Sequence, residues 1–167
     1  MESCEGCGFE WDAVTAAEVP PRLQAAAAGF RTVLAGDAVA LASHRDDTTW
    51  SPVEYGAHVR DVLLNLRDRI VLGLAQDNPV PHAMFGDLRI RSGLYAADRP
   101  DQLTADIDVA AGLFVRTIAA LDDEQLARPI FYGWPTAATR TLLWVAAQAL
   151  HEAEHHLTDV QALSVAS

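Results

Sequence analysis

The spacing of apolar residues along the chain predicts four helices. Apolar side chains recur every three or four positions over residues 22–43, 52–76, 101–121 and 140–166. Residues 77–100, between the second and third stretches, contain three of the eight prolines and two of the ten glycines, which is typical of a long connection. The pattern therefore predicts an all-α four-helix bundle with one long crossover connection.

The starts of the helices carry residues that favour capping. Ser51 lies directly before a proline and three residues before Glu54, which is the capping-box pattern. The third and fourth helices have cap candidates of their own, Asp101 or Thr104 and Thr139. The aromatic run just before the last helix is expected to form a loop or a hairpin.

Residues 1–19 are expected to form a tail outside the bundle, which then occupies residues 20–167. Both cysteines lie in this tail as Cys4-Glu-Gly-Cys7, too close in sequence to join distant parts of the fold. The spacing leaves three interpretations open: a disordered tail, a redox pair, or two thiolate ligands for a metal. The disordered tail is the simplest of them, whereas a tail that folds back could bring a cysteine to a metal site on the bundle.

Charge and composition narrow the range of partners. The formal net charge is −11, and all twelve basic residues are arginines spread along the chain, which argues against binding to nucleic acid. The N-terminus lacks the basic and apolar segments of a signal peptide, and no apolar run is long enough to cross a bilayer. We therefore expect a cytoplasmic protein that binds neither nucleic acid nor membranes.

Three histidines are candidate metal ligands. His151 and His155 are four residues apart in the predicted last helix, so their side chains lie on one face, about 5–6 Å apart at Cβ. That face also carries Trp144 and Ala147, so the pair is expected to point into the bundle. His58 lies on a stripe too polar for an ordinary core face, and it can supply a third ligand if the second and fourth helices are neighbours. Three protein ligands would leave a position open for water or substrate.

The same histidines allow two other interpretations. His151-Glu152-Ala153-Glu154-His155 matches the H-E-x-x-H motif of zinc metalloproteases, with Glu152 as the general base. Only twelve residues follow His155, and they offer no suitably placed histidine or glutamate as a third ligand, which disfavours a protease. The remaining interpretation is a polar helix surface on which the histidines bind nothing.

Two segments resemble the DinB/YfiT-like superfamily of metalloenzymes. The first is TTWSPVEYGAHVRDVLLNL at residues 48–66, with the pattern W-S-x-x-E-x-x-x-H, and the second is LLWVAAQALHEAEHHLTDVQAL at residues 142–163. The resemblance extends over about residues 20–165 and implies a four-helix bundle with a long crossover. It also implies that the three candidate histidines form one metal triad, and it leaves His156 without a role.

The resemblance further implies a function. The characterised activities of the superfamily include transfer of low-molecular-weight thiols such as mycothiol or bacillithiol, and mycothiol-dependent isomerisation of maleylpyruvate. For this chain it suggests a metal-dependent thiol S-transferase or isomerase that acts on small-molecule substrates. Three imidazoles suit zinc, nickel, copper and iron alike, and we expect zinc first and nickel second. A metal with an open position can bind a thiol as the thiolate and lower its pKa. Arg89, Arg91 and Tyr95, in the crossover connection, are expected to hold such a thiol cofactor.

Two functions without catalysis stand as alternatives. A metal-responsive or redox-responsive binding module would use the cysteines and histidines as sensors, and full coordination of the ion without water would favour it. A structural bundle would associate through its apolar faces. A homodimer is compatible with those faces, although no residue specifies the oligomeric state.

Overall fold

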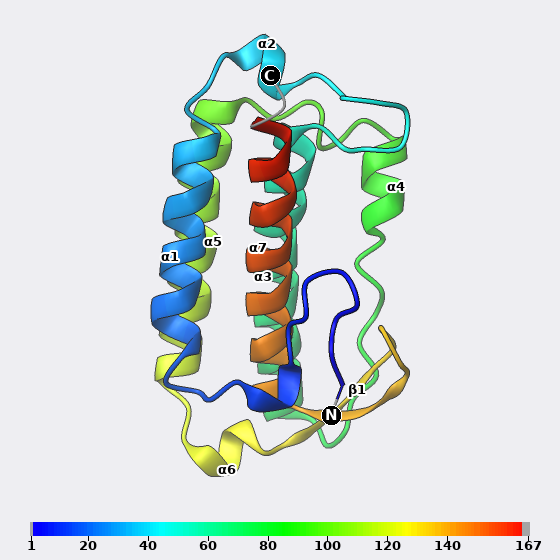
Figure 1. Ribbon diagram of the computed structural model, residues 1–167. Helices are drawn as coiled ribbons and strands as arrows, with labels where there is room; N and C mark the ends of the chain where they lie inside the picture. The colour runs from blue at the N-terminus through cyan, green and yellow to red at the C-terminus, as the bar shows by residue number, and fades with distance from the viewer. Residues whose placement is uncertain (1, 165–167) are drawn as a thin grey trace.

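The structure, a computed structural model, describes residues 2–164 and shows a bundle of four long helices (Figure 1). The four are α1 (Val19–Val33), α3 (Pro52–Ala75), α5 (Pro100–Ala119) and α7 (Leu142–Ser164). Helices α1 and α3 each pack against both α5 and α7, so the four helices form a closed ring around the core. The predicted all-α four-helix bundle is confirmed.

Helices α3 and α5 run in the same direction, which requires a crossover from one end of the bundle to the other (Figure 1). The crossover contains the short helix α4 (Gly86–Arg91) and runs along the outside of the bundle. The other short elements are η1 (Trp11–Ala13), α2 (Ala38–Leu41), α6 (Asp123–Leu126), β1 (Pro129–Tyr132) and β2 (Ala138–Thr141). The two strands form an antiparallel hairpin that leads directly into α7.

The helix ends follow from local hydrogen bonds. The Ser51 hydroxyl accepts from the backbone N–H of Glu54, and the Glu54 carboxylate accepts from the backbone N–H of Ser51, which confirms the capping box of α3. Helix α5 begins one residue before the first expected cap, because Pro100 occupies its first turn, where no N–H partner is needed. Helix α7 is capped by Thr141, whose hydroxyl accepts from the N–H of Trp144, and Thr139 lies in strand β2 instead.

The first predicted helix, residues 22–43, is two helices in the structure. Helix α1 ends at Val33, and the chain restarts as α2 when Asp37 accepts hydrogen bonds from the backbone N–H groups of Val39 and Ala40. The apolar spacing continues across this break, so periodicity alone does not reveal it. An aspartate after a glycine at residues 36–37 is the local signal for a stop and a new start.

Small residues let α7 lie deep in the bundle. Four alanines on the helix are at most 1% exposed, namely Ala146, Ala147, Ala149 and Ala153. At Gly73 of α3, an added Cβ atom would lie 2.5 Å from Cδ2 of Leu142, so any larger residue would force the Leu142 side chain to shift. Polar side chains on α7 are therefore held in a packed environment.

Among the described residues, no helix is both long and apolar enough to span a membrane.

The N-terminal residues pack against the bundle, which differs from the expectation of a disordered tail. Ser3 and Glu10 form an antiparallel bridge, so residues 3–10 fold as a hairpin-like loop beside α7 (Figure 1). Trp11 is only 2% exposed and stacks on Trp144 with ring centroids 5.9 Å apart. Burial of this large side chain stabilises the folded arrangement of the segment, an effect that its cysteine-rich composition does not reveal.

Replacing Ser51 with alanine is expected to lower the free energy of unfolding by about 1 kcal/mol, because it removes the side-chain cap of α3. Chemical denaturation of the metal-free protein measures this difference. Ser92, whose hydroxyl bonds only to a nearby backbone carbonyl at an exposed position, is the control, and its alanine variant should match the wild type. Equal stability of the Ser51 variant and the wild type would contradict the prediction.

Candidate metal centre

Helix α7 carries two pairs of candidate ligands. His151 and His155 are four residues apart, as are Glu152 and His156, so the members of each pair are one helical turn apart. The second pair is offset from the first by one residue, which rotates it by about 100° around the helix axis. The first pair meets the cysteines of the N-terminal loop, and the second pair meets His58 of α3.

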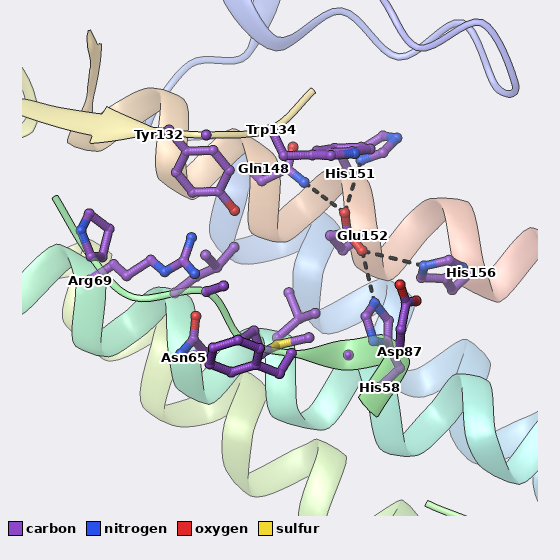
Figure 2. Close-up of a pocket in the computed structure, with 18 of the residues that line it drawn as sticks. His58, Asn65, Arg69, Asp87, Tyr132, Trp134, Gln148, His151, Glu152 and His156 are labelled. Carbon is purple, nitrogen blue, oxygen red and sulfur yellow. Dashed lines mark hydrogen bonds and ion pairs between the residues drawn. The ribbon is translucent and has the colours of Figure 1, made fainter. Parts of the chain in front are cut away.

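The first cluster consists of His58, Glu152 and His156, whose ligand atoms all lie within 4.8 Å of one another (Figure 2). Oε2 of Glu152 is 3.2 Å from Nε2 of His58 and 3.3 Å from Nε2 of His156. His58 is 9% exposed, and its Nδ1 is buried without a hydrogen bond. The cluster thus brings two imidazoles to a single carboxylate oxygen.

A chain of hydrogen bonds holds the carboxylate of Glu152 in place. The Gln148 amide donates to Oε1 of Glu152 at 2.7 Å, and the Trp11 indole donates to the Gln148 oxygen at 2.6 Å. Burial favours the neutral acid, but contacts with His151, His156 and His58 outweigh it and hold the pKa of Glu152 well below its usual value. Glu152 is therefore an oriented anion.

His156 is held from its other side by Asp159. Its Nδ1 lies 2.9 Å from the Asp159 carboxylate, and burial, which disfavours the imidazolium, is outweighed by this bond and by Glu152. The pKa of His156 is thereby raised to about 9. The possible ligand atoms of His155, His156 and Asp159 also lie within 4.8 Å of one another. The carboxylate of Asp159 fixes the orientation of His156, as carboxylates commonly do for metal-ligating histidines.

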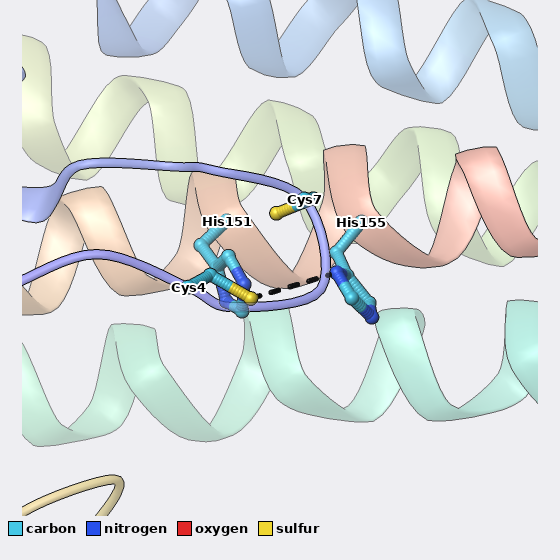
Figure 3. Close-up of side chains that lie close together, drawn as sticks. All are labelled: Cys4, Cys7, His151 and His155. Atoms are coloured by element: carbon cyan, nitrogen blue, oxygen red, sulfur yellow. Dashed lines mark hydrogen bonds between the residues drawn. The ribbon is translucent and has the colours of Figure 1, made fainter.

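The second cluster consists of Cys4, Cys7, His151 and His155, again with all ligand atoms within 4.8 Å (Figure 3). Burial opposes ionisation of Cys4, but contacts with His151 and with the backbone of Cys7 and Gly6 lower the pKa of Cys4 to about 7. For His155, burial disfavours the imidazolium and lowers the pKa. The sulfur and nitrogen atoms of this cluster are of the types that bind zinc.

The first cluster lies in the wall of a cleft of about 930 Å³, and so do Cys4, His151 and His155 of the second cluster, whereas Cys7 does not line the cleft. Helix α3 contributes His58, Val62, Asn65, Leu66 and Arg69 to the cleft lining. All of these except Leu66 belong to the stripe of His58 predicted from the sequence, whose other members, Glu54 and Asp61, do not line the cleft. The Asn65 side-chain oxygen and Nε of Arg69 are buried without hydrogen-bond partners. Exposed apolar side chains line the same cleft, namely Val80, Phe85, Leu88 and Trp134. The cleft therefore offers an apolar mouth with a cation and an amide deeper inside.

The predicted site residues are distributed as follows. Among the described residues, His58 does not share a group of ligand atoms with His151 and His155, because it faces the Glu152 side of α7. Arg91 lines the cleft, whereas Arg89 pairs with Asp61 on α3 and does not line it. Tyr95 is likewise outside the cleft lining and is 1% exposed in the core, with its ring 6.2 Å from that of His58. The single triad and the thiol-binding role of these three residues stay predictions.

Glu152 and His156 are not among the metal ligands predicted from the sequence. There, Glu152 appears only as the general base of a protease, and His156 has no role. The signal for both was present, because H-E-x-x-H-H contains a second pair with i, i+4 spacing one residue after the first. Only the position of α3 around the axis of α7 decides which pair meets His58, and a helical wheel does not contain that information.

The fold and the clusters define a four-helix bundle protein with a crossover and with candidate metal ligands on its last helix. A model of the DinB superfamily matches residues 21–160, and the chain belongs to that superfamily. No match was found among curated proteins.

Solved structures with the same fold have low sequence identity to the chain. YfiT from Bacillus subtilis, described as a probable metal-dependent hydrolase with an unusual four-helix bundle topology, is 18% identical with a TM-score of 0.79, over 92% of this chain and 90% of that one. The mycothiol-dependent maleylpyruvate isomerase is 12% identical with a TM-score of 0.71. That match covers 96% of this chain but only 63% of the isomerase chain.

Proposed function

We propose that the protein is a metal-dependent enzyme whose ion is held by His58, Glu152 and His156. The observation that carries the proposal is the convergence of three ligand atoms in the cleft wall, within 4.8 Å of one another. Metal–nitrogen and metal–oxygen bonds of about 2.0–2.1 Å in a tetrahedral site place neighbouring ligand atoms about 3.3–3.4 Å apart. Glu152 Oε2 lies 3.2 and 3.3 Å from the two imidazole nitrogens, which fits that spacing.

The ligand set favours catalysis over a purely structural role. Two histidines and one glutamate leave a fourth position free, as in catalytic zinc sites, and the cluster faces a cleft. A bound divalent ion supplies Lewis-acid chemistry and can activate a thiol or a water molecule near neutral pH. Asp159 and Gln148 orient the ligand side chains from outside the set, which is how such sites are usually supported.

The cleft favours a small anionic substrate with an apolar part. Among the described residues, no carboxylate forms an ion pair with Arg69, whose Nη2 donates to the backbone carbonyl of His82. Arg69 can therefore receive a carboxylate or phosphate group, and Asn65 lies one helical turn away. We propose a low-molecular-weight thiol as the second reactant. In its transfer, the sulfur–hydrogen bond and the bond between the electrophilic carbon and its leaving group break, and a sulfur–carbon bond forms. The proton goes to the displaced group or to solvent.

Metal counting on untagged protein tests the ligand set. His58→Ala and His156→Ala are each expected to lose one ion per chain relative to the wild type, and to lose the same one, so that the double variant loses no more. The earlier prediction of a triad of His58, His151 and His155 gives a different result. If His58, His151 and His155 bound one ion together, His58→Ala and His151→Ala would lose the same ion, and His156→Ala would keep it.

Turnover of a thiol with a small electrophile tests the activity. Consumption of mycothiol or bacillithiol is expected to depend on added zinc or nickel and to disappear in His58→Ala. Arg69→Ala should raise KM for a carboxylate-bearing substrate by about tenfold with less effect on kcat, because it removes a binding interaction worth about 1.5 kcal/mol or more. Equal KM values for acidic and neutral substrates in the wild type would contradict the role of Arg69.

A further inference from the structure

The N-terminal loop has the geometry of a ligand-bearing turn. The backbone N–H of Gly8 donates to the carbonyl of Cys4 at 2.7 Å, and the N–H of Cys4 donates to the carbonyl of Phe9 at 2.8 Å. Gly8 has a φ of +72°, a conformation that glycine adopts without strain. The turn therefore presents both cysteines of the C-x-x-C-G sequence to the same side of the loop, where α7 lies (Figure 3).

The loop is shaped around His155. A Cβ atom added at Gly6 would lie 3.1 Å from Cε1 of His155 and 3.8 Å from Sγ of Cys4, so the backbone approaches the ring closely. Cys4 Sγ is 3.9 Å from Nδ1 of His155, and Nε2 of the same ring is 3.6 Å from Asp159. This is the arrangement of a metal-ligating histidine that also faces a carboxylate.

His151 gives an independent indication of a ligand. Its side chain is buried, with the residue 3% exposed, and both ring nitrogens are buried without a hydrogen bond. Its Nδ1 lies 3.8 Å from Glu152, which is too far for a hydrogen bond. A buried polar atom without a hydrogen bond costs free energy, so an interaction closer than the 3.8 Å contact with Glu152 would stabilise these nitrogens. A metal ion is one that a ring nitrogen can make directly.

We propose that Cys4, Cys7, His151 and His155 bind a zinc ion, separate from the ion in the His58 cluster. Four ligands in tetrahedral coordination, with bonds of about 2.0–2.3 Å, lie about 3.3–3.8 Å apart, and the observed atoms are all within 4.8 Å. Closing the site therefore requires shifts of about 1 Å. Two thiolates and two imidazoles fill the coordination sphere, which makes this a structural site and not a second catalytic one.

The proposed zinc fastens the loop that supports the other cluster. Phe9 and Trp11 follow the cysteines directly, and their rings contact His151 with centroid distances of 5.2 and 4.8 Å. Trp11 donates to Gln148, and Gln148 donates to Glu152. Zinc at the cysteines would therefore hold Trp11 where it orients the carboxylate of the cleft cluster. The proposal itself does not depend on the function proposed for that cluster.

Cobalt binding to the full-length, untagged, metal-free protein under reducing conditions tests the proposal. The wild type is expected to show a thiolate-to-cobalt charge-transfer band. Cys7→Ser and His155→Ala should each lose the band and one equivalent of bound cobalt. His58→Ala is the matched control, and it should keep the full band. Absence of the band in the wild type, or its persistence in His155→Ala, would overturn the proposal. If His58→Ala keeps both the band and every equivalent of cobalt, the proposed function fails and the cysteine site stands.

A second measurement uses the wild type alone, so it does not depend on whether the variants fold. The alkylation rate of Cys4 and Cys7 by iodoacetamide is followed by mass spectrometry in the fully reduced protein. Two equivalents of zinc per chain, one for each proposed site, should slow alkylation of both cysteines at least about tenfold. The reason is that thiolates bound to zinc are poor nucleophiles. A chelator should restore the original rate. Unchanged alkylation of reduced protein would overturn the zinc site and favour a redox pair.

Discussion

Replacing Glu152 with glutamine is expected to lower the affinity of the cleft cluster for zinc at least about a hundredfold. Glutamine keeps the size of the side chain but offers the ion a neutral oxygen in place of a carboxylate. It also removes the negative charge that lies beside the imidazoles of His58 and His156. Loss of a supporting residue behind a ligand already costs about 10–100-fold in affinity, so loss of a charged ligand should cost no less. Competition with a chromophoric chelator measures the affinity.

Glu154→Gln is the matched control for this variant. It removes the same charge from the same helix, two residues away, but Glu154 forms a two-bond pair with Arg22 outside the cluster. The control should therefore bind zinc in the cleft like the wild type. If the two variants lose affinity equally, the effect is the net charge of α7 and not ligation by Glu152, and the proposed ligand set is wrong.

Trp11→Ala is expected to lower the free energy of unfolding of the metal-free protein by about 3–5 kcal/mol, the usual cost of truncating a buried aromatic residue. Trp11→Phe separates packing from hydrogen bonding. It keeps most of the contact with Trp144 but leaves the Gln148 oxygen without its donor, and it should weaken zinc binding in the cleft about 10–100-fold. Denaturation in the presence of a chelator and zinc competition measure the two effects.

Trp144→Phe serves as the control for the hydrogen bond. Trp144 is buried and stacked on Trp11, but its indole nitrogen makes no hydrogen bond, so loss of that nitrogen removes no interaction. Its zinc affinity should equal that of the wild type. A loss of affinity in Trp144→Phe as large as in Trp11→Phe would mean that ring packing, and not the bond to Gln148, supports Glu152.

The fold was predictable because its signals are local. The four apolar stretches and the capping box at Ser51 each depend on residues a few positions apart, and they define the helices without knowledge of the tertiary structure. The errors also have local causes. The break at Asp37 interrupts no apolar spacing, and Pro100 starts α5 ahead of the cap that its polar neighbours suggested. Periodicity indicates which face is buried, but it indicates poorly where a helix ends.

The site was only partly predictable because it depends on rotation and on a remote segment. The spacing of polar residues in the sequence predicts candidate ligands on α7 and a polar stripe around His58. His58 and these α7 residues line the cleft. Whether His151 and His155 or Glu152 and His156 face α3 depends on how α3 and α7 pack against each other. The folded position of Cys4 and Cys7 depends on the burial of Trp11 between distant parts of the chain. Tertiary contacts of this kind leave no periodic trace in the sequence.

The one-residue offset between the two pairs on α7 restricts how that helix can turn. Each residue advances the helix by about 100°, so any rotation of α7 moves both clusters together and by the same angle. A turn that brought His151 toward α3 would withdraw it from the N-terminal loop, and it would carry Glu152 away from His58. Only one angular setting of α7 serves both partners. An insertion of one residue between Gln148 and His151 would turn His151 and His155 toward His58, and it would turn Glu152 and His156 away from it. Both present clusters would therefore be lost together.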